Sequence, residues 1–176
     1  NSALSQDAKQ GERVFKLCTY CHGERGEGRQ DLAAPSIAGL PEWYLKRQLI
    51  KFYDGVRGLH PKDVGGMRMH PMAKTLEKDR DIDAVSQYVA TLPKVPVADT
   101  VKGRVLKGET AYKVCISCHG ENAEGNEAVG APPLVRSSDW YLVSQLHNFK
   151  AGIRAGDPTK DPTGAAMRGM AAALSP

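Results

Sequence analysis

The chain has 176 residues and a formal net charge of +4, and 41% of its residues are hydrophobic. This length allows one or two domains. There is no run of 18 apolar residues, so no membrane-spanning helix is expected and any membrane contact would be peripheral. Basic and acidic residues alternate, and no Lys/Arg run is longer than Lys46-Arg47, which indicates an ordinary solvated surface rather than a nucleic-acid-binding one.

The first predicted helix covers residues 5–17 and leads directly into Cys18-Thr19-Tyr20-Cys21-His22, a C-x-x-C-H motif. Two thiols at this spacing reach the two vinyl groups of one porphyrin and form thioethers. The histidine that follows can then bind the iron as its proximal ligand. The motif therefore indicates a covalent c-type haem held by Cys18, Cys21 and His22.

Helical patterns continue after the motif. Pro41 opens a second predicted helix over residues 42–53, and Gly55 closes it. A Met-rich loop over residues 67–72 follows, and a third helix is expected from Asp79 or Asp81 to Leu92. No segment alternates strongly enough for a strand, so the fold class is all-α, with Gly/Pro-rich loops suited to wrapping a flat cofactor.

The chain then repeats itself. Residues 93–100 contain two prolines and predict an extended linker between an N-terminal domain, 1–92, and a C-terminal domain, 101–176. A shift of 97 residues aligns the first motif with Cys115-Ile116-Ser117-Cys118-His119. The same shift aligns further residues across both copies: Gly11 with Gly108, Pro35 with Pro132, Trp43-Tyr44-Leu45 with Trp140-Tyr141-Leu142, Gln48 with Gln145, Phe52 with Phe149 and Arg57 with Arg154. Duplication of one haem domain is the direct interpretation, so two haems are expected.

Other uses of the four cysteines are weaker. A zinc site built from both cysteine pairs leaves unexplained why His22 and His119 follow at once. A thioredoxin-like motif needs a βαβ context that is absent, and disulfides would strain two close cysteine pairs. Covalent haem attachment by this motif implies assembly outside the cytoplasm, so we expect a mature periplasmic protein whose export signal has been removed.

The two copies differ at their ends. Residues 77–92 of the first copy have no counterpart after Leu174. This predicts either a truncated chain or a second domain without its closing helix, and we favour truncation or disorder.

The sixth iron ligand is expected from the two Met-rich segments. Met69 and Met167 each precede a leucine by seven residues, and Met72 and Met170 each precede it by four. Spacing alone does not choose between these two registers, whereas Met67 has no partner in the second copy. Met/His ligation would raise the reduction potential relative to bis-His ligation and close the iron to peroxide and oxygen.

Three histidines are rival ligands: His60, His70 and His147. None of them faces a histidine in the other copy, and a duplicated site should duplicate its ligand. We therefore interpret all three as surface or structural residues.

The pattern resembles the dihaem cytochrome c4 family. The shared features are the tandem C-x-x-C-H-G motifs, a Tyr-Leu-x-x-Gln-Leu helix after each, and the closing Met-containing segments. The resemblance covers nearly the whole chain. It implies two class-I cytochrome c-like haem domains, related by a pseudo-two-fold axis, with two covalent haem c groups.

The resemblance also implies roles for residues. Met69 and Met167, in the outer register, become the axial ligands opposite His22 and His119, and Met72 and Met170 become packing for the haem pocket. The carbonyls of Pro35 and Pro132 accept the hydrogen bond from the histidine Nδ1. Trp43, Tyr44, Trp140 and Tyr141 either donate to haem propionates or pack between helices.

The function implied is electron transfer rather than catalysis, since no catalytic acid, base or nucleophile is apparent. We expect a periplasmic carrier that takes electrons from a quinol-oxidising complex, a cytochrome or a small copper protein and delivers them to a terminal oxidase. Two alternatives stay open: a dihaem subunit of a flavoprotein dehydrogenase, and a dihaem peroxidase with one displaceable ligand.

Overall fold

The computed structural model describes residues 2–135 and 137–174, and it divides into two compact units, Asn1–Val97 and Ala98–Pro176. The boundary lies inside the segment predicted as a linker, and residues 93–104 have no helical structure. Within the described residues the regular structure is helical, apart from one isolated bridge in each unit, Arg29–Ala34 and Asn126–Ala131. The all-α prediction is therefore confirmed.

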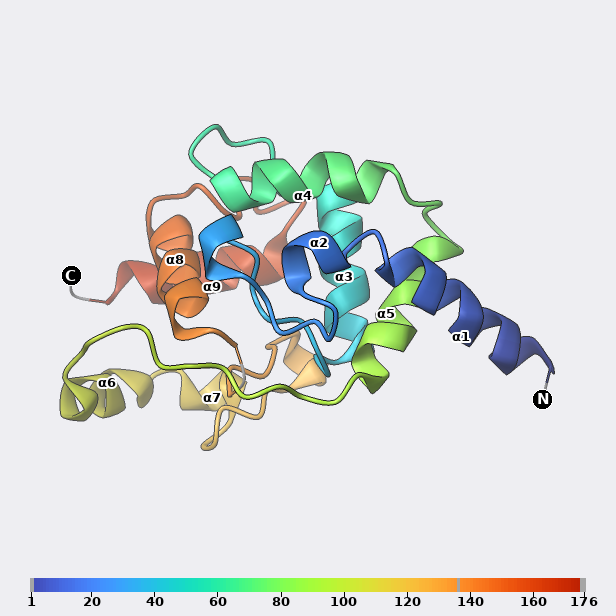
Figure 1. Cartoon of the computed structure of the whole chain (residues 1–176). Helices are drawn as coiled ribbons and strands as arrows, with labels where there is room; N and C mark the ends of the chain where they lie inside the picture. The colour runs from blue at the N-terminus through green and yellow to red at the C-terminus, as the bar shows by residue number, and fades with distance from the viewer. Residues whose placement is uncertain (1, 136, 175–176) are drawn as a thin grey trace. The chain divides into compact units, whose positions relative to one another are not determined.

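The N-terminal unit contains five α-helices and one short 3₁₀ helix in its described part (Figure 1). They are α1 (Ser2–Phe15), α2 (Thr19–His22), η1 (Gln30–Leu32), α3 (Glu42–Tyr53), α4 (Val64–Lys74) and α5 (Asp81–Thr91). The three predicted helices correspond to α1, α3 and α5. The Met-rich segment was expected to be a loop, and that prediction is wrong because it forms helix α4.

The residue composition of α4 and its N-cap explain why the sequence pattern did not predict this helix. Gly65, Gly66 and Pro71 are poor helix formers, and they weaken the helical pattern of the sequence. The buried Asp63 compensates as the N-cap, where its carboxylate accepts a 3.0 Å hydrogen bond from the Gly66 amide. An N-cap contributes about 1 kcal/mol, enough to offset one glycine.

The core of the N-terminal unit lies where α1 packs on α5, with α3 against both α4 and α5. Its buried members are Val14, Phe15, Leu45, Leu76, Ile82, Val85 and Val89. The Phe15 and Tyr88 ring centroids are 5.5 Å apart. Gly11 allows the close approach of α1 to α5, because a Cβ at this position would lie 2.3 Å from the Ala84 carbonyl oxygen.

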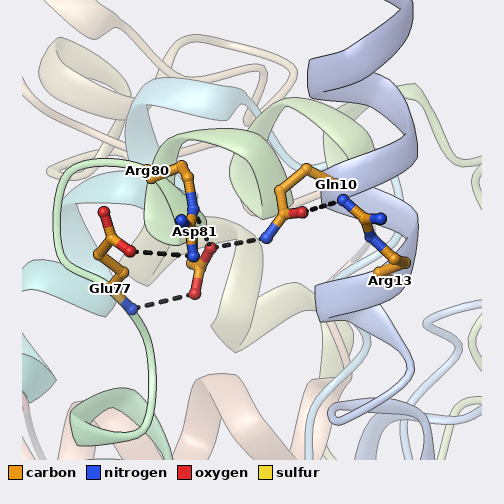
Figure 2. A network of polar contacts seen from close by, with 5 residues as sticks. All are labelled: Gln10, Arg13, Glu77, Arg80 and Asp81. Atoms are coloured by element: carbon orange, nitrogen blue, oxygen red, sulfur yellow. Dashed lines mark hydrogen bonds and ion pairs between the residues drawn. The ribbon is translucent and has the colours of Figure 1, made fainter.

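A polar network joins the same two helices (Figure 2). Gln10 of α1 donates to the Asp81 carboxylate at 2.8 Å and also accepts from Arg13. Asp81 accepts further bonds from Arg80 and from the Glu77 amide, at 3.1 Å each, and Arg80 pairs with Glu77 at 2.9 Å. Burial alone would raise the pKa of Asp81, but these donors outweigh it and lower the pKa below its ordinary value.

The C-terminal unit repeats the order of elements of the N-terminal unit from its first helix to its Met-rich helix. Its elements are α6 (Val105–Tyr112), α7 (Ile116–His119), η2 (Glu127–Val129), α8 (Asp139–Lys150) and α9 (Pro162–Ala172). Helix α8 packs on α9 around the buried Phe149, Ala155 and Ala171. Helix α9 holds the second Met-rich segment, which is again helical and capped by a buried aspartate, Asp161, on the Gly164 amide at 2.7 Å.

The start of the C-terminal unit differs from that of the N-terminal one. Helix α6 has no buried residue, and Val105 is 82% exposed. The end of the linker is fastened by Asp139 at the start of α8, which accepts bonds from Thr100 N and Oγ1 at 2.6 Å and from Val101 N at 2.7 Å. These bonds, led by the one from the Thr100 side chain, lower the pKa of Asp139 to about 2.

Candidate haem sites

The two C-x-x-C-H motifs have the same local conformation. In each, the first cysteine precedes a single helical turn, α2 or α7, that ends at the histidine. The backbone angles φ and ψ are −92° and −24° at Cys18 and −90° and −22° at Cys115. The glycine after each histidine has a φ of 82°, a conformation that side chains rarely adopt, and it ends the turn. One helical turn thus places both thiols and the imidazole of each motif along a single short segment.

Each motif histidine is buried and oriented by a proline carbonyl. His22 Nδ1 lies 2.8 Å from the Pro35 oxygen, and His119 Nδ1 lies 2.8 Å from the Pro132 oxygen. A carbonyl only accepts hydrogen bonds, so Nδ1 carries the hydrogen and Nε2 keeps its lone pair. These are the contacts that the resemblance to cytochromes c4 implied for Pro35 and Pro132.

The remaining nitrogen is available to a ligand. His119 Nε2 is buried and has no hydrogen-bond partner in the structure, an arrangement that costs free energy unless another group meets it. Burial lowers the pKa of His22, and the bond to Pro35 only partly opposes this, so the ring is neutral at pH 7. A neutral imidazole with a fixed Nδ1 hydrogen is the form that binds a metal.

No disulfide links any of the four cysteines, all of which the structure describes. Burial, with a smaller contribution from Cys21, raises the pKa of Cys18 to about 11, and burial also raises the pKa of Cys115. Both thiols are therefore protonated at neutral pH. In the part of the chain that the structure describes, no three His, Cys, Asp or Glu side chains converge as a metal-ion site. Thioether attachment uses the cysteines in pairs and needs no such cluster.

The methionines of the two registers differ in burial. Met69 on α4 and Met167 on α9 are partly buried. Met72 is 42% exposed and Met170 is 40% exposed, as is Met67 at 45%. Met167 packs against the buried cluster of the C-terminal unit.

The rival histidines have other surroundings. His70 Nδ1 lies 2.5 Å from the Phe52 carbonyl and ties α4 to the end of α3. His60 Nδ1 accepts from the Lys62 amide at 3.2 Å, and His147 is exposed on α8. His70 thus has a structural contact of the kind predicted for it.

The aromatic pairs on α3 and α8 contact each other. Trp43 and Tyr44 have ring centroids 5.8 Å apart in an edge-on arrangement, and Trp140 and Tyr141 repeat the same distance. Arg47 lies over the Trp43 ring at 4.8 Å. Each of these contacts lies within a single helix, so packing between helices and donation to haem propionates both stay predictions.

Comparison with known proteins identifies the family. The Cytochrome c family model matches residues 8–93 and again residues 105–176. The chain belongs to the cytochrome c family. It therefore carries two covalently bound haem c groups, and each matched region contains one C-x-x-C-H motif.

Relatives within the family narrow the comparison. The chain is 30% identical to cytochrome c4 of Azotobacter vinelandii over 181 residues, covering 96% of this chain and 82% of that one. It is 36% identical to a thiosulfate dehydrogenase electron acceptor of Thiomonas intermedia over 154 residues, covering 80% of this chain and only 66% of that one. The crystal structure of reduced cytochrome c4 from Pseudomonas stutzeri superposes with a TM-score of 0.74 at 28% identity, covering 96% of this chain and 90% of that one. The resemblance to cytochromes c4 is thus confirmed.

The residues of both motifs fit haem c and exclude the zinc interpretation. Each motif offers a thiol pair and a histidine whose Nδ1 faces a proline carbonyl, whereas a zinc site would use thiolates, and burial disfavours the thiolates of Cys18 and Cys115. When bound, haem supplies a one-electron ferric/ferrous couple. The chain is therefore a dihaem cytochrome c of electron transfer. No helix among the described residues is long and apolar enough to cross a membrane.

Sequence reasoning missed one feature of both domains. Arg57 and Arg154 are buried, as are Asp63 and Asp161, although charged side chains are rarely buried. The signal was present in the repeat, where Arg57 aligns with Arg154, but the alignment alone assigned no role to the pair.

Proposed function

We propose that this chain is a periplasmic dihaem electron carrier in which His22 and Met69 bind one haem iron and His119 and Met167 bind the other. The observation that carries the proposal is the duplicated histidine–proline bond, 2.8 Å in both domains. It holds each imidazole in the tautomer whose Nε2 lone pair can bind a metal.

Burial supports the choice of methionine. A ligand must lie against the flat face of a porphyrin that fills the apolar interior, and Met69 and Met167 are the partly buried members of their pairs. Met72 and Met170, at 42% and 40% exposed, suit the edge of the pocket. Thioether ligation on the second face closes both irons to small molecules, which opposes the peroxidase alternative and favours electron transfer.

The chain's own residues then have defined tasks. Thioether links from Cys18 and Cys21 and from Cys115 and Cys118 would hold each porphyrin on its helical turn, so that the cofactor would stay bound in both oxidation states. His22 and His119 keep their Nδ1 hydrogen on a carbonyl, and no proton needs to move with the electron. We propose that a quinol-oxidising complex or a small copper protein supplies electrons and a terminal oxidase removes them.

A spectroelectrochemical titration tests the ligand assignment. In Met69→Ala and Met167→Ala, we expect loss of the red-region charge-transfer band of Met-ligated ferric haem at one site and a fall in one of the two potentials. Met72→Ala and Met170→Ala are matched controls and should keep both bands. If Met72→Ala or Met170→Ala loses a band while the Met69 or Met167 variant of the same domain keeps it, the ligand is the methionine four residues before the leucine, Met72 or Met170.

A second candidate is an electron acceptor of a dehydrogenase. It is favoured by the similarity to the thiosulfate dehydrogenase electron acceptor. The name of that relative points to a dehydrogenase acting on thiosulfate, and the flavoprotein dehydrogenase suggested by the sequence stays a prediction. Mixing the oxidised protein with a thiosulfate dehydrogenase and thiosulfate, and following haem reduction in stopped flow, distinguishes it from a carrier that is reduced rapidly only by a quinol-oxidising complex or a copper protein.

A further inference from the structure

The buried arginine of the C-terminal domain is held in one orientation. Arg154 is 7% exposed and lies in the turn between α8 and α9. Its Nη1 donates to Gln145 Oε1 at 2.8 Å, and its guanidinium lies 4.4 Å from the centre of the Phe149 ring. The Arg154 amide also donates to the Asn148 carbonyl at 3.0 Å. The Arg154 side chain thus fastens the turn to Gln145 and Phe149, which lie one helical turn apart on the same face of α8.

The N-terminal domain repeats this arrangement closely. Arg57 is 5% exposed, donates to Gln48 Oε1 at 2.7 Å and lies 4.3 Å from the centre of the Phe52 ring. Its amide donates to the Lys51 carbonyl at 3.0 Å. Burying a guanidinium that stays charged at all accessible pH values costs free energy, and an apolar side chain would fill the same space at lower cost. What arginine adds is a rigid fork that fixes one orientation.

The fastened turn contacts the helix that carries the partly buried methionine. In the C-terminal domain the residue after Arg154 is Ala155, which is 2% exposed. A Cβ built on Gly164 would lie only 2.7 Å from the Ala155 Cβ, so the turn touches the first turn of α9. Met167 lies three residues beyond Gly164, on the same side of the helix. It packs against the cluster that contains Phe149 and Ala155.

The equivalent turn in the N-terminal domain also lies against its methionine helix. Gly58 follows Arg57 with a φ of +85°, and a Cβ there would lie 2.3 Å from the Gly66 carbonyl oxygen of α4. Met69 again lies three residues beyond this glycine. In both domains the residue that follows the arginine therefore contacts the first turn of the helix that carries the methionine.

We propose that Arg57 and Arg154 are positioning residues that fix the distance of Met69 and Met167 from the iron. The inference rests on the proposed function, because it takes these methionines as the axial ligands. The arginines set the strength of the Met–iron bond, and with it the reduction potential and the resistance of the iron to foreign ligands.

The two domains should depend on their arginine to different degrees. His70 on α4 contacts the Phe52 carbonyl at 2.5 Å and gives the N-terminal methionine helix a second fastening. The matching side chain on α9 is Arg168, which lies near Gly152 but has no corresponding bond to the Phe149 carbonyl among the described contacts. Loss of Arg154 should therefore affect its haem more than loss of Arg57 affects the other.

The test uses the holoprotein with Arg154→Lys and Arg57→Lys, which keep the charge and lose the fork. For Arg154→Lys we expect imidazole to enter the ferric C-terminal site about tenfold faster, in line with the effect of changing groups that orient a metal ligand. If Arg154→Lys weakens the preference of methionine for ferrous over ferric iron tenfold, the reduction potential of the C-terminal haem falls by about 59 mV. Arg57→Lys should show a smaller change, and adding His70→Ala should make the two sites alike.

Controls separate the possible failures. Arg104→Lys makes the same change at an exposed position of the C-terminal domain and should change nothing. If Arg154→Lys does not fold, Gln145→Asn replaces it, because it withdraws the acceptor of Arg154; Ser144→Ala, which removes another contact of Gln145, is then its control. If Met167→Ala keeps the Met–iron band, the ligand assignment fails and the inference falls with it. If Met167→Ala loses the band while the arginine and glutamine variants keep wild-type potential and imidazole rate, the inference alone is wrong.

Discussion

The contact between α1 and α5 gives a sharp prediction because the repeat supplies its own control. Gly11 is buried, and a Cβ there would lie 2.3 Å from the Ala84 carbonyl oxygen and 2.6 Å from Tyr88 Cβ. Gly108 occupies the matching position of α6, and a Cβ there meets nothing within 4 Å. Alanine at these two equivalent positions should therefore have opposite effects on stability.

The magnitudes follow from packing and helix propensity. Overpacking a core costs about 1–3 kcal/mol, and a clash with backbone that no rotamer change relieves belongs at the upper end. Alanine returns about 1 kcal/mol relative to glycine inside a helix. Gly11→Ala should thus destabilise the N-terminal domain by about 2 kcal/mol, a factor of about 30. Gly108→Ala creates no clash, so it should stabilise the C-terminal domain by up to about 1 kcal/mol through helix propensity alone.

Hydrogen exchange followed by mass spectrometry measures each domain separately, so two-state behaviour of the whole chain is not needed. In Gly11→Ala, amides of residues 81–91 should exchange about 30-fold faster. In Gly108→Ala, those amides should be unchanged and amides of residues 105–112 should be protected. Stabilisation of residues 81–91 by Gly11→Ala would refute the close approach of α1 to α5.

Three further predictions concern the core, the acid response and the cofactor. Ile82→Ala, at a fully buried position, should destabilise by about 2–5 kcal/mol in urea unfolding, whereas Val105→Ala, 82% exposed, should stay within about 0.5 kcal/mol. The pKa of Asp139 is lowered to about 2, so its stabilisation is complete above pH about 4 and is lost as the pH falls toward 2; Asp139→Asn should flatten this part of an acid titration followed by circular dichroism. Replacing Cys115 and Cys118 by alanine should leave one covalent haem per chain by mass spectrometry, and two remaining haems would contradict the attachment sites.

The sequence was sufficient where the chemistry is local. The C-x-x-C-H motifs define a single helical turn, so the positions of Cys18 and His22 follow from spacing alone. The helices α1, α3 and α5 have apolar faces repeated at helical period, and their existence followed from that pattern. The carbonyl of Pro35 was identified by resemblance, because a backbone acceptor leaves no trace in residue type.

The sequence was insufficient where structure depends on contacts between distant segments. Helix α4 was missed because Gly65, Gly66 and Pro71 argue locally against a helix, while the Asp63 cap and packing on α3 decide for it. Burial of Arg57 is likewise a tertiary outcome. Arginine is mostly exposed in proteins, and only the arrangement of Gln48 and Phe52 on one face of α3 shows that this one is held inside.

The two copies within one chain separate what the haem site requires from what it tolerates. The histidine–proline distance is 2.8 Å in both, and the arginine–glutamine pairs differ by only 0.1 Å, being 2.7 and 2.8 Å. The position of Phe15, buried against Tyr88, is taken in the second copy by Tyr112, whose hydroxyl instead donates to the Gly120 carbonyl at 2.7 Å. Because the proposed ligands are the same in both domains, we expect a difference in potential between the two haems to arise from the packing around them, including this contact and the His70 contact of α4. A carrier with one ligand set and two environments can hold its two electrons at different potentials without changing the chemistry at either iron.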